Sequence, residues 1–195
     1  MIFCATNRQK ELFLADDTRQ AGLIHRLRDG DSAAFADFIA RYQQQVFMCC
    51  RLLGLGADEI EDVASETFLA AYQGIGRYTG RAKLSTWLWK ISYNKAINYL
   101  RGKIRHQKLQ EKLQNQYTDV QEAAALEPSA EIVWDAVKKL PQDSAMAIVL
   151  YYRQEKSIKE IADIMGKNKN TVKIYLFRGR EKLKELLGDK IERLY

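Results

Sequence analysis

Apolar residues recur at three- and four-residue steps through most of the chain, and strand-like alternation is sustained nowhere. This spacing lines up apolar side chains on one face of an α-helix. It predicts a helix over 18–28, a second helix that stops near Gly54 and a third that runs to about Tyr72. Asp31 or Ser32 is placed to cap the second helix. The chain is therefore predicted to be all-α.

Two other helix starts can be predicted from polar residues. Asp58 and Glu61 stand in capping-box positions for the third helix, and Ser85 follows a glycine-containing loop and is placed to cap a fourth. Helical spacing resumes in the carboxyl-terminal part, where Pro141 begins a further helix.

Residues 106–130 are rich in glutamine and weakly patterned, which is typical of a linker. At 195 residues the chain is long enough for two small domains. We expect a helical domain over 21–105 and another over 131–195, joined by this flexible linker, with 1–20 as an extension of no assigned role. Each domain is expected to bury a core of its own.

Charge is distributed in blocks along the sequence. Residues 76–112 carry ten bases and one acid, 113–135 carry five acids and no base, and 166–195 carry nine bases and four acids. Two basic blocks separated by an acidic one indicate two contacts with nucleic acid.

The first basic block combines cations with aromatic rings. Residues 76–105 contain eight Lys or Arg, no acid and five aromatic residues. Cations follow a phosphate backbone and flat rings hold unstacked bases, so this pattern favours single-stranded nucleic acid. On a helix one polar stripe would be formed by Lys90, Asn94, Asn98, Arg101 and Arg105.

The second basic block has the spacing of a helix-turn-helix. Ser157 can cap a short helix, Gly166 allows the turn, and Asn168 can cap the helix that follows. The exposed face of that second helix would place Lys and Arg side chains against base edges and phosphates in a major groove. The alternative interpretation is an ordinary helical hairpin with a basic solvent face.

Three segments in this order resemble the extracytoplasmic-function sigma factors of the sigma-70 family: DEIEDVASETFLAAY, LSTWLWKISYNKAINYLR and the helix-turn-helix. The resemblance implies a region 2-like bundle and a region 4-like helix-turn-helix domain. It implies contact with the polymerase core through Asp62, Ser65 and Glu66. It implies reading of the minus-ten element by Arg77, Arg81, Lys83, Trp87, Lys90, Asn94, Asn98, Arg101 and Arg105. It implies reading of the minus-thirty-five element by Lys169, Asn170, Thr171, Lys173, Ile174, Phe177, Arg178 and Arg180.

The family resemblance also implies partners. These are bacterial RNA polymerase core (its β′ clamp coiled coil and β flap), promoter DNA and an anti-sigma factor, with no catalysis and no cofactor. Trp87 fits the core or a wedge at the duplex fork equally well, whereas Trp89 and Tyr93 fall on another face and are expected to serve the polymerase or an inhibitor. Free in solution the chain is expected to bind promoters poorly, because the linker leaves the two readers without fixed spacing.

Other classes of protein fit the sequence less well. A stand-alone helix-turn-helix regulator with a helical sensor domain would leave the aromatic and cationic stripe unexplained. A nucleic-acid enzyme would need clustered acids for metal ions, and the two histidines lie in unrelated places. Cys4, Cys49 and Cys50 lack metal-site spacing, so no metal is expected. No apolar run approaches the roughly 20 residues of a membrane span, and no signal peptide is evident, so a cytoplasmic location is expected.

Overall fold

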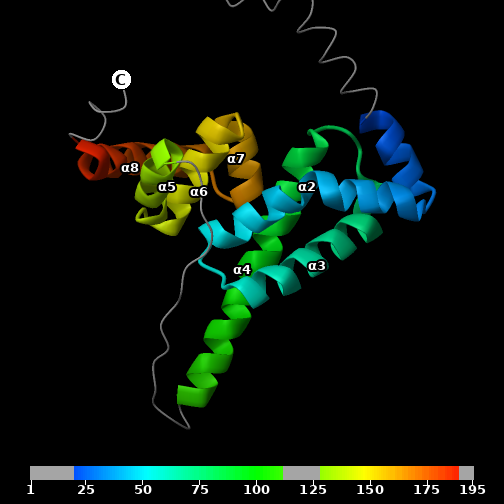
Figure 1. The fold of residues 1–195 in the computed structure, drawn as a ribbon, viewed down its shortest axis with the longest axis horizontal. Coiled ribbons are helices and arrows are strands. Elements are labelled where there is room, and N and C mark those ends of the chain that lie inside the picture. Colours follow the sequence, from blue (N-terminus) through cyan, green and yellow to red (C-terminus); the bar gives the residue numbers. More distant parts are fainter. Residues whose placement is uncertain (1–19, 112–127, 189–195) are drawn as a thin grey trace, which may run out of the picture.

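The computed structural model describes residues 20–111 and 128–188, and within these ranges every regular element is helical (Figure 1). Residues 20–28 form the described part of the first helix. The remaining elements are α2 (Ser32–Leu52), α3 (Ala57–Gly74), η1 (Ile75–Arg77), α4 (Leu84–Glu111), α5 (Pro128–Lys138), α6 (Gln142–Ile148), η2 (Val149–Arg153), α7 (Ile158–Met165) and α8 (Lys169–Leu187). The predicted all-α class is confirmed. Residues 112–127 of the predicted linker, and 1–19 of the predicted extension, lie outside the described residues.

The predicted starts of the helices were partly right. Asp31 caps α2, because its Oδ1 accepts hydrogen bonds from the backbone N–H groups of Ala33 and Ala34 at 2.9 and 3.1 Å. At α3 the predicted capping box was wrong by two residues. The helix is capped at Gly56, whose backbone N–H donates to Glu59 Oε2 at 2.8 Å.

The prediction for α4 was also wrong at its start. This helix begins at Leu84, so Ser85 lies inside its first turn. The Ser85 hydroxyl instead accepts a hydrogen bond from Lys156 Nζ at 3.0 Å, a residue 71 positions further along the chain.

The amino-terminal half, which we define as residues 20–111, has a hydrophobic core drawn only from itself. We call this the amino-terminal core. The Phe38 ring lies at its centre, 5.8 Å from the ring of Phe68 and 5.1 Å from that of Tyr42 (centroid to centroid). Its buried members are Leu27, Ala34, Phe38, Tyr42, Val46, Ala64, Phe68, Ala71, Ile75, Tyr78, Leu84 and Leu88.

The carboxyl-terminal half, residues 128–188, is organised around a close crossing of α6 and α8. Gly179 of α8 makes this crossing possible, since a Cβ atom there would lie 2.7 Å from Cγ1 of Ile148. Between α6 and α7 the chain forms one turn of wider π-helix, η2, followed by Glu155 in the left-handed region at φ 51°. Helix α7 then packs against α8 to form the helix-turn-helix.

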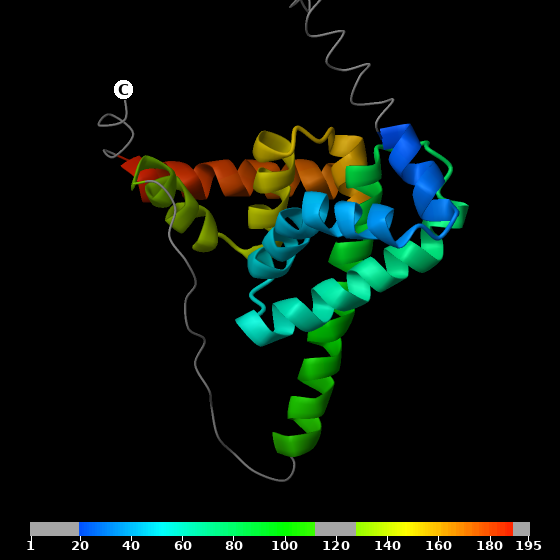
Figure 2. The ribbon, with the colours of Figure 1, turned by 45° about the vertical axis from the view of Figure 1, so that its right-hand side comes forward.

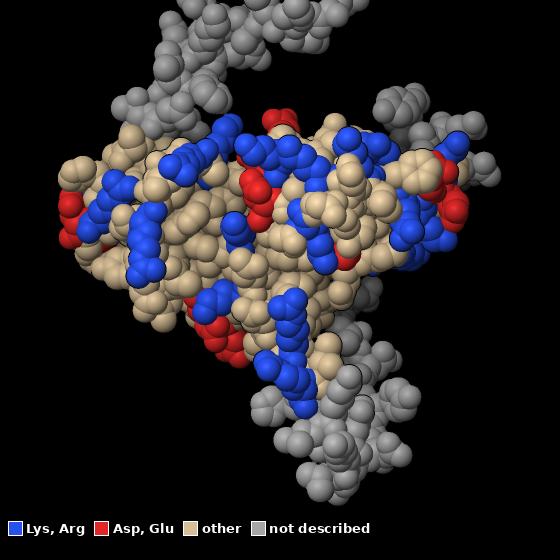
Figure 3. Space-filling view, turned by 180° about the vertical axis from the view of Figure 1, so that it is seen from behind, with Lys and Arg blue, Asp and Glu red and all other residues tan. Residues whose placement is uncertain are grey.

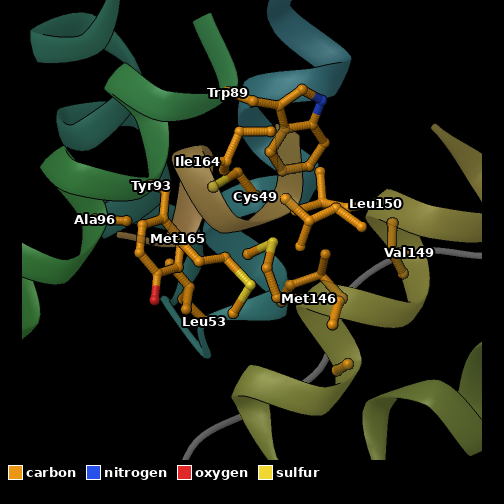
Figure 4. Close-up of a cluster of buried hydrophobic side chains, with 14 of the residues drawn as sticks. Cys49, Leu53, Trp89, Tyr93, Ala96, Met146, Val149, Leu150, Ile164 and Met165 are labelled. Carbon is orange, nitrogen blue, oxygen red and sulfur yellow. The ribbon is translucent and has the colours of Figure 1, made fainter. Parts of the chain in front are cut away.

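The two halves pack against each other, with α7 on α4 and α6 on α2 (Figures 1 and 2). Their contact forms a second hydrophobic cluster, which we call the shared core. Trp89 and Tyr93 of α4 are buried in it beside Met146, Leu150 and Ile164 (Figure 4). The structure thus differs from the expectation that each domain buries its own core.

Hydrogen bonds between the halves surround the shared core. Thr86 Oγ1 donates to Glu160 Oε1 at 3.1 Å, and Gln142 Nε2 donates to the carbonyl of Leu53 at 3.0 Å. With the bond from Lys156 to Ser85, they tie α6, η2 and α7 to the amino-terminal half. Beyond this contact the end of α4 projects away from the rest of the molecule (Figure 2).

Candidate nucleic-acid and protein interfaces

The polar stripe predicted on α4 is present and faces solvent. Its members Lys90, Asn94, Asn98, Arg101 and Arg105 are all exposed. Leu84 and Leu88 lie on the opposite side of the same helix and are fully buried in the amino-terminal core. Viewed from behind, the molecule shows patches of Lys and Arg side chains over the body and along the projecting end of α4, with smaller patches of acidic side chains among them (Figure 3).

The loop before α4 is held in place by Tyr78. The Tyr78 hydroxyl donates to the carbonyl of Ala82, and the Tyr78 carbonyl accepts from Arg28 Nη2 at 2.6 Å. These bonds leave the three cations predicted to hold DNA here, Arg77, Arg81 and Lys83, on the exposed side.

Trp87 lies between the loop and the body of the protein. Its ring is 5.2 Å from that of Tyr78, and its edge lies against Gly74, where a Cβ would be 3.4 Å from Cζ2. The side chain is half-buried. Trp87 therefore packs against the amino-terminal core and keeps one part of its ring in contact with solvent.

Trp89 and Tyr93 do not form an open face. Trp89 is 0% exposed and Tyr93 is also buried, because α6 and α7 cover them (Figure 4). The Trp89 Nε1–H group is buried and has no hydrogen-bonding partner among the described residues. Burial raises the pKa of the Tyr93 hydroxyl to about 12. In this arrangement neither residue is accessible to another protein, which corrects the expectation from the sequence.

The predicted polymerase-contact residues Asp62, Ser65 and Glu66 are all exposed on α3. The Glu66 carboxylate forms an ion pair with Lys95 Nζ at 3.1 Å. Asp62 therefore presents the less compensated negative charge of the two.

An apolar groove adjoins these acids, and the sequence analysis missed it. It has a volume of about 410 Å³ and runs between α2 and α3. Ser65 and Glu61 lie at its polar edge, and Leu69, whose side chain is 55% exposed, lies at its apolar edge. The apolar wall is formed by Phe35, Ile39, Phe47, Ala64 and Phe68. An exposed leucine beside aromatic residues on two amphipathic helices was the available signal.

The helix-turn-helix has the local structure that its sequence predicts. Ser157 and Glu160 form a capping box at α7, Gly166 adopts φ 62° in the turn, and Asn168 Oδ1 accepts from the Thr171 backbone N–H at 2.8 Å. Val172 and Leu176 are buried against the shared core.

The opposite face of α8 is open. Thr171 is half-buried, and the other seven predicted minus-thirty-five residues are exposed: Lys169, Asn170, Lys173, Ile174, Phe177, Arg178 and Arg180. Phe177 is 63% exposed, which is unusual for a phenylalanine and gives the face an apolar tip among its cations.

Arg180 is fixed in position by neighbouring tyrosines. Its Nε donates to the Tyr152 hydroxyl at 2.9 Å, and its guanidinium carbon lies 5.7 Å from the ring centroids of both Tyr151 and Tyr152. A cation held in this way presents its charge at a defined place, whereas an unattached side chain would sample many positions.

The described residues offer little for metal or redox chemistry. They contain no group of three or more His, Cys, Asp or Glu side chains that could hold a metal ion. Cys49 and Cys50 are both buried, and burial raises the pKa of Cys50 to about 12 and that of Cys49 well above its usual value. Both thiols are therefore protonated at neutral pH and pack in the shared core.

Among the described residues, no helix has the length and apolar character needed to span a membrane.

Comparison with known proteins identifies both halves. Residues 38–106 match Sigma-70 region 2, and residues 130–183 match Sigma-70, region 4. The chain is 32% identical over 179 residues to the ECF RNA polymerase sigma factor SigW of Bacillus subtilis (strain 168). This match covers 85% of this chain and 95% of SigW. It is 31% identical over 172 residues to the ECF RNA polymerase sigma-E factor of Escherichia coli (strain K12), and this match covers 82% of this chain and 89% of that sigma-E factor.

Solved structures share the fold. CnrH, in complex with the cytosolic domain of CnrY, matches with a TM-score of 0.59 at 23% identity over 86% of this chain and 96% of CnrH. The sigma factor RpoE of Bartonella quintana, in complex with the anti-sigma factor NepR, matches with a TM-score of 0.63 at 22% identity. That match covers 78% of this chain and 96% of RpoE. On the strength of the sequence relatives and the two matched regions, this chain belongs to the ECF RNA polymerase sigma factors.

Proposed function

We propose that this sigma factor binds RNA polymerase core through α3 and the apolar groove, reads the minus-ten element with α4 and reads the minus-thirty-five element with α8. The observation that carries the proposal is the pair of exposed reading faces, one on α4 and one on α8, within a single chain. A stand-alone regulator needs the second face alone and leaves the first without a role.

The α4 stripe suits a base that has left the duplex. The amides of Asn94 and Asn98 offer both donors and an acceptor, which matches the edge of a base better than a phosphate. Lys90, Arg101 and Arg105 lie along the same exposed face and would hold the backbone on either side. Capturing an unstacked base would offset the few kcal/mol that its extrusion costs.

The α8 face suits a double-stranded element. Lys173 and Arg178 can donate to guanine edges, and Phe177 can contact a thymine methyl group. Arg180 already donates its Nε–H to Tyr152, so it is better suited to a backbone phosphate, which does not need the full fork of donors that reads a base edge.

The α3 surface suits a protein partner. Asp62 and Glu66 would meet basic side chains on the β′ clamp coiled coil, while the groove lined by Phe35, Phe68 and Leu69 would receive apolar side chains. Apolar anchors supply most of the energy of such contacts, and charges outside the groove mainly set orientation and association rate.

Promoter binding requires the halves to separate. The two promoter elements are centred about 25 base pairs apart, or about 85 Å at about 3.4 Å per base pair. Helix α4, with 28 residues, is only about 42 Å long, and α7 is packed directly against it. The free chain therefore holds its readers too close together. This replaces the expectation that the two reading faces of the free chain lack any fixed spacing. Binding to polymerase core would supply the wider spacing that the promoter requires.

Several further features belong to the proposal. The chain performs no catalysis, needs no cofactor and acts in the cytoplasm. An anti-sigma factor would regulate it, as NepR is found bound to RpoE of Bartonella quintana. The β flap of polymerase would receive the carboxyl-terminal half.

The α4 contact is tested with promoter templates that are either duplex or already melted at the minus-ten element. Asn94→Ala or Asn98→Ala should weaken recognition of the preferred base by about 1–3 kcal/mol on both templates. The loss should be confined to one minus-ten position and leave core binding intact. Full rescue of both variants by pre-melting, with no change in base preference, would show that the asparagines do not read sequence.

The α3 contact is tested by reversing charge. Asp62→Lys with Glu66→Lys should weaken binding to core polymerase and leave binding of the minus-thirty-five duplex unchanged. The matched control reverses Asp29 and Asp37, two other exposed acids of the same half. Equal core affinity for both double variants would refute the role of the α3 acids.

A further inference from the structure

A polar cavity of about 460 Å³ lies between the two halves, away from the apolar groove and on the other side of α2 from it. Among the described residues, its lining contains four cations and one acid. Arg41 and Lys83 come from the amino-terminal half, whereas Arg153, Lys156 and the acid Glu155 come from the carboxyl-terminal half. The contact between the halves thus assembles a site of positive charge that neither half has alone.

Lys156 makes this cavity different from an ordinary basic surface. Its side chain is only 7% exposed, and its Nζ donates to Ser85 Oγ at 3.0 Å across the contact between the halves. Burial lowers the pKa of Lys156; the nearby Glu160 carboxylate opposes this effect, and the charge of Lys83 adds to it. Lys83 and Lys156 therefore repel each other across this cavity, and a phosphate oxygen between them would relieve that repulsion.

The backbone at the edge of the cavity is strained. Glu155 has φ 51°, and among the described residues it is the one non-glycine with a positive φ. A non-glycine residue in this region is strained and persists where surrounding contacts hold it. Here the strain places the Glu155–Lys156 turn directly against Ser85 of α4.

We propose that this cavity, formed by Arg41, Lys83, Arg153 and Lys156, binds a small anion that carries two or three linked phosphates. Arginine guanidinium groups bind phosphate oxygens through two parallel hydrogen bonds, and lysines add point charges. Two or three linked phosphates offer enough oxygens to contact cations of both halves at once. The volume lies within the range of about 300–1,000 Å³ usual for small-ligand sites. A DNA duplex is too broad to reach the covered Nζ of Lys156.

Binding of such an anion would favour the packed arrangement. The cavity exists only while η2 and α7 lie against α2 and α4, so a ligand that fills it stabilises that packing by mass action. Lys83 also belongs to the predicted minus-ten surface, so occupancy of the cavity and capture of promoter DNA would compete for this residue. The binding site itself does not depend on the proposed function, since its test uses neither polymerase nor promoter.

The test is calorimetric titration of the full chain with sodium tripolyphosphate at constant ionic strength. We expect saturable binding of one anion per chain. Arg41→Gln and Arg153→Gln, which change exposed residues on different halves, should each weaken it at least about tenfold. Lys159→Gln removes an exposed cation of α7 that does not line the cavity and should change it less than about twofold.

A further variant should strengthen tripolyphosphate binding, a result that a misfolded protein would not give. Glu155→Gln removes the acid that lines the cavity among the described residues and should tighten tripolyphosphate binding about threefold to tenfold, whereas Asp163→Asn, an exposed acid of α7 outside the cavity, should not. Absence of saturable binding would overturn the proposal. So would equal weakening by all three cation variants, or dependence on the cations of one half only. Both arginine variants could instead bind single-stranded DNA more weakly and tripolyphosphate as tightly as the wild type. The cavity would then be part of the DNA-binding surface, and the proposal would be wrong.

Discussion

The amino-terminal core and the shared core differ in where their residues come from. Every buried residue of the amino-terminal core lies between Leu27 and Leu88, within one half of the chain. The shared core combines α2, α3 and α4 with α6, α7 and α8. One of these cores therefore survives separation of the halves, and the other is divided by it.

The two cores also differ in how completely their polar groups are satisfied. In the amino-terminal core the Tyr78 hydroxyl donates to a backbone carbonyl. In the shared core the Trp89 indole N–H is buried without a partner among the described residues. An unpaired buried donor costs about 1–3 kcal/mol, and this cost disappears when the indole reaches water or a partner. The contact between the halves therefore carries an energetic cost that separation of the halves would remove, and this would favour the separated arrangement proposed for promoter binding.

The largest effect should come from the amino-terminal core. Phe38→Ala removes a buried ring in contact with Phe68 and Tyr42 and should lower the free energy of unfolding by about 3–5 kcal/mol. Urea denaturation followed by circular dichroism measures it. Phe177→Ala makes the same change at an exposed site and should cost less than about 0.5 kcal/mol. Similar losses in the two variants would show that Phe38 does not organise a core.

A smaller effect should come from the crossing inside the carboxyl-terminal half. Gly179→Ala places a methyl group 2.7 Å from Ile148 Cγ1 and should cost about 1–3 kcal/mol. Gly102→Ala, within α4, meets nothing within 4 Å and should instead stabilise the protein by about 0.5–1 kcal/mol. Thermal unfolding of both variants checks the opposite signs. Stabilisation by Gly179→Ala would mean that α6 and α8 do not cross this closely.

The smallest effect concerns one hydrogen-bonded carboxylate between the halves. Burial tends to raise the pKa of Glu160, but hydrogen bonds from Ser157 and Thr86 and the charge of Lys156 outweigh it and lower that pKa below its ordinary 4.5. The stability it contributes is therefore present above about pH 4.5 and is lost as the pH falls through its lower folded value. Glu160→Gln should cost about 0.5–1 kcal/mol at pH 7 and reduce the loss of stability between pH 5 and 3.

Glu181→Gln, at an exposed acid of α8, is the matched control for Glu160. It should leave the pH dependence of unfolding unchanged. If both variants gave the wild-type pH profile, Glu160 would not contribute to the contact through its charge.

Local structure could be predicted well from the sequence, because it depends on neighbouring residues. Asp31, Ser157 and Asn168 cap helices as predicted, and Gly166 adopts the left-handed turn. The polar stripe on α4 is exposed because its spacing opposes that of Leu84 and Leu88. The α3 capping box failed because Glu59 reaches Gly56, a cap with no side chain to recognise.

The arrangement of the halves could not be predicted, because it depends on contacts between residues far apart in the chain. Trp89 and Tyr93 look like an open aromatic face when α4 is considered alone, and only α6 and α7 show that they are buried. Lys156 likewise has no local feature that pairs it with Ser85, 71 positions away. The basic cavity was missed for the same reason, since each half contributes only two of its cations.

The contact between the halves can be followed through hydrogen exchange at the indole N–H of Trp89, measured by nuclear magnetic resonance on tryptophan-labelled full chain. The signal is identified by its absence in Trp89→Phe, and the half-buried Trp87 provides the internal comparison. We predict that the Trp89 proton exchanges at least about 100-fold more slowly than that of Trp87 in the free chain and loses this protection when core polymerase is added. Equally fast exchange of the two protons in the free chain would contradict the shared core, and protection that persists in the polymerase complex would contradict the separation of the readers.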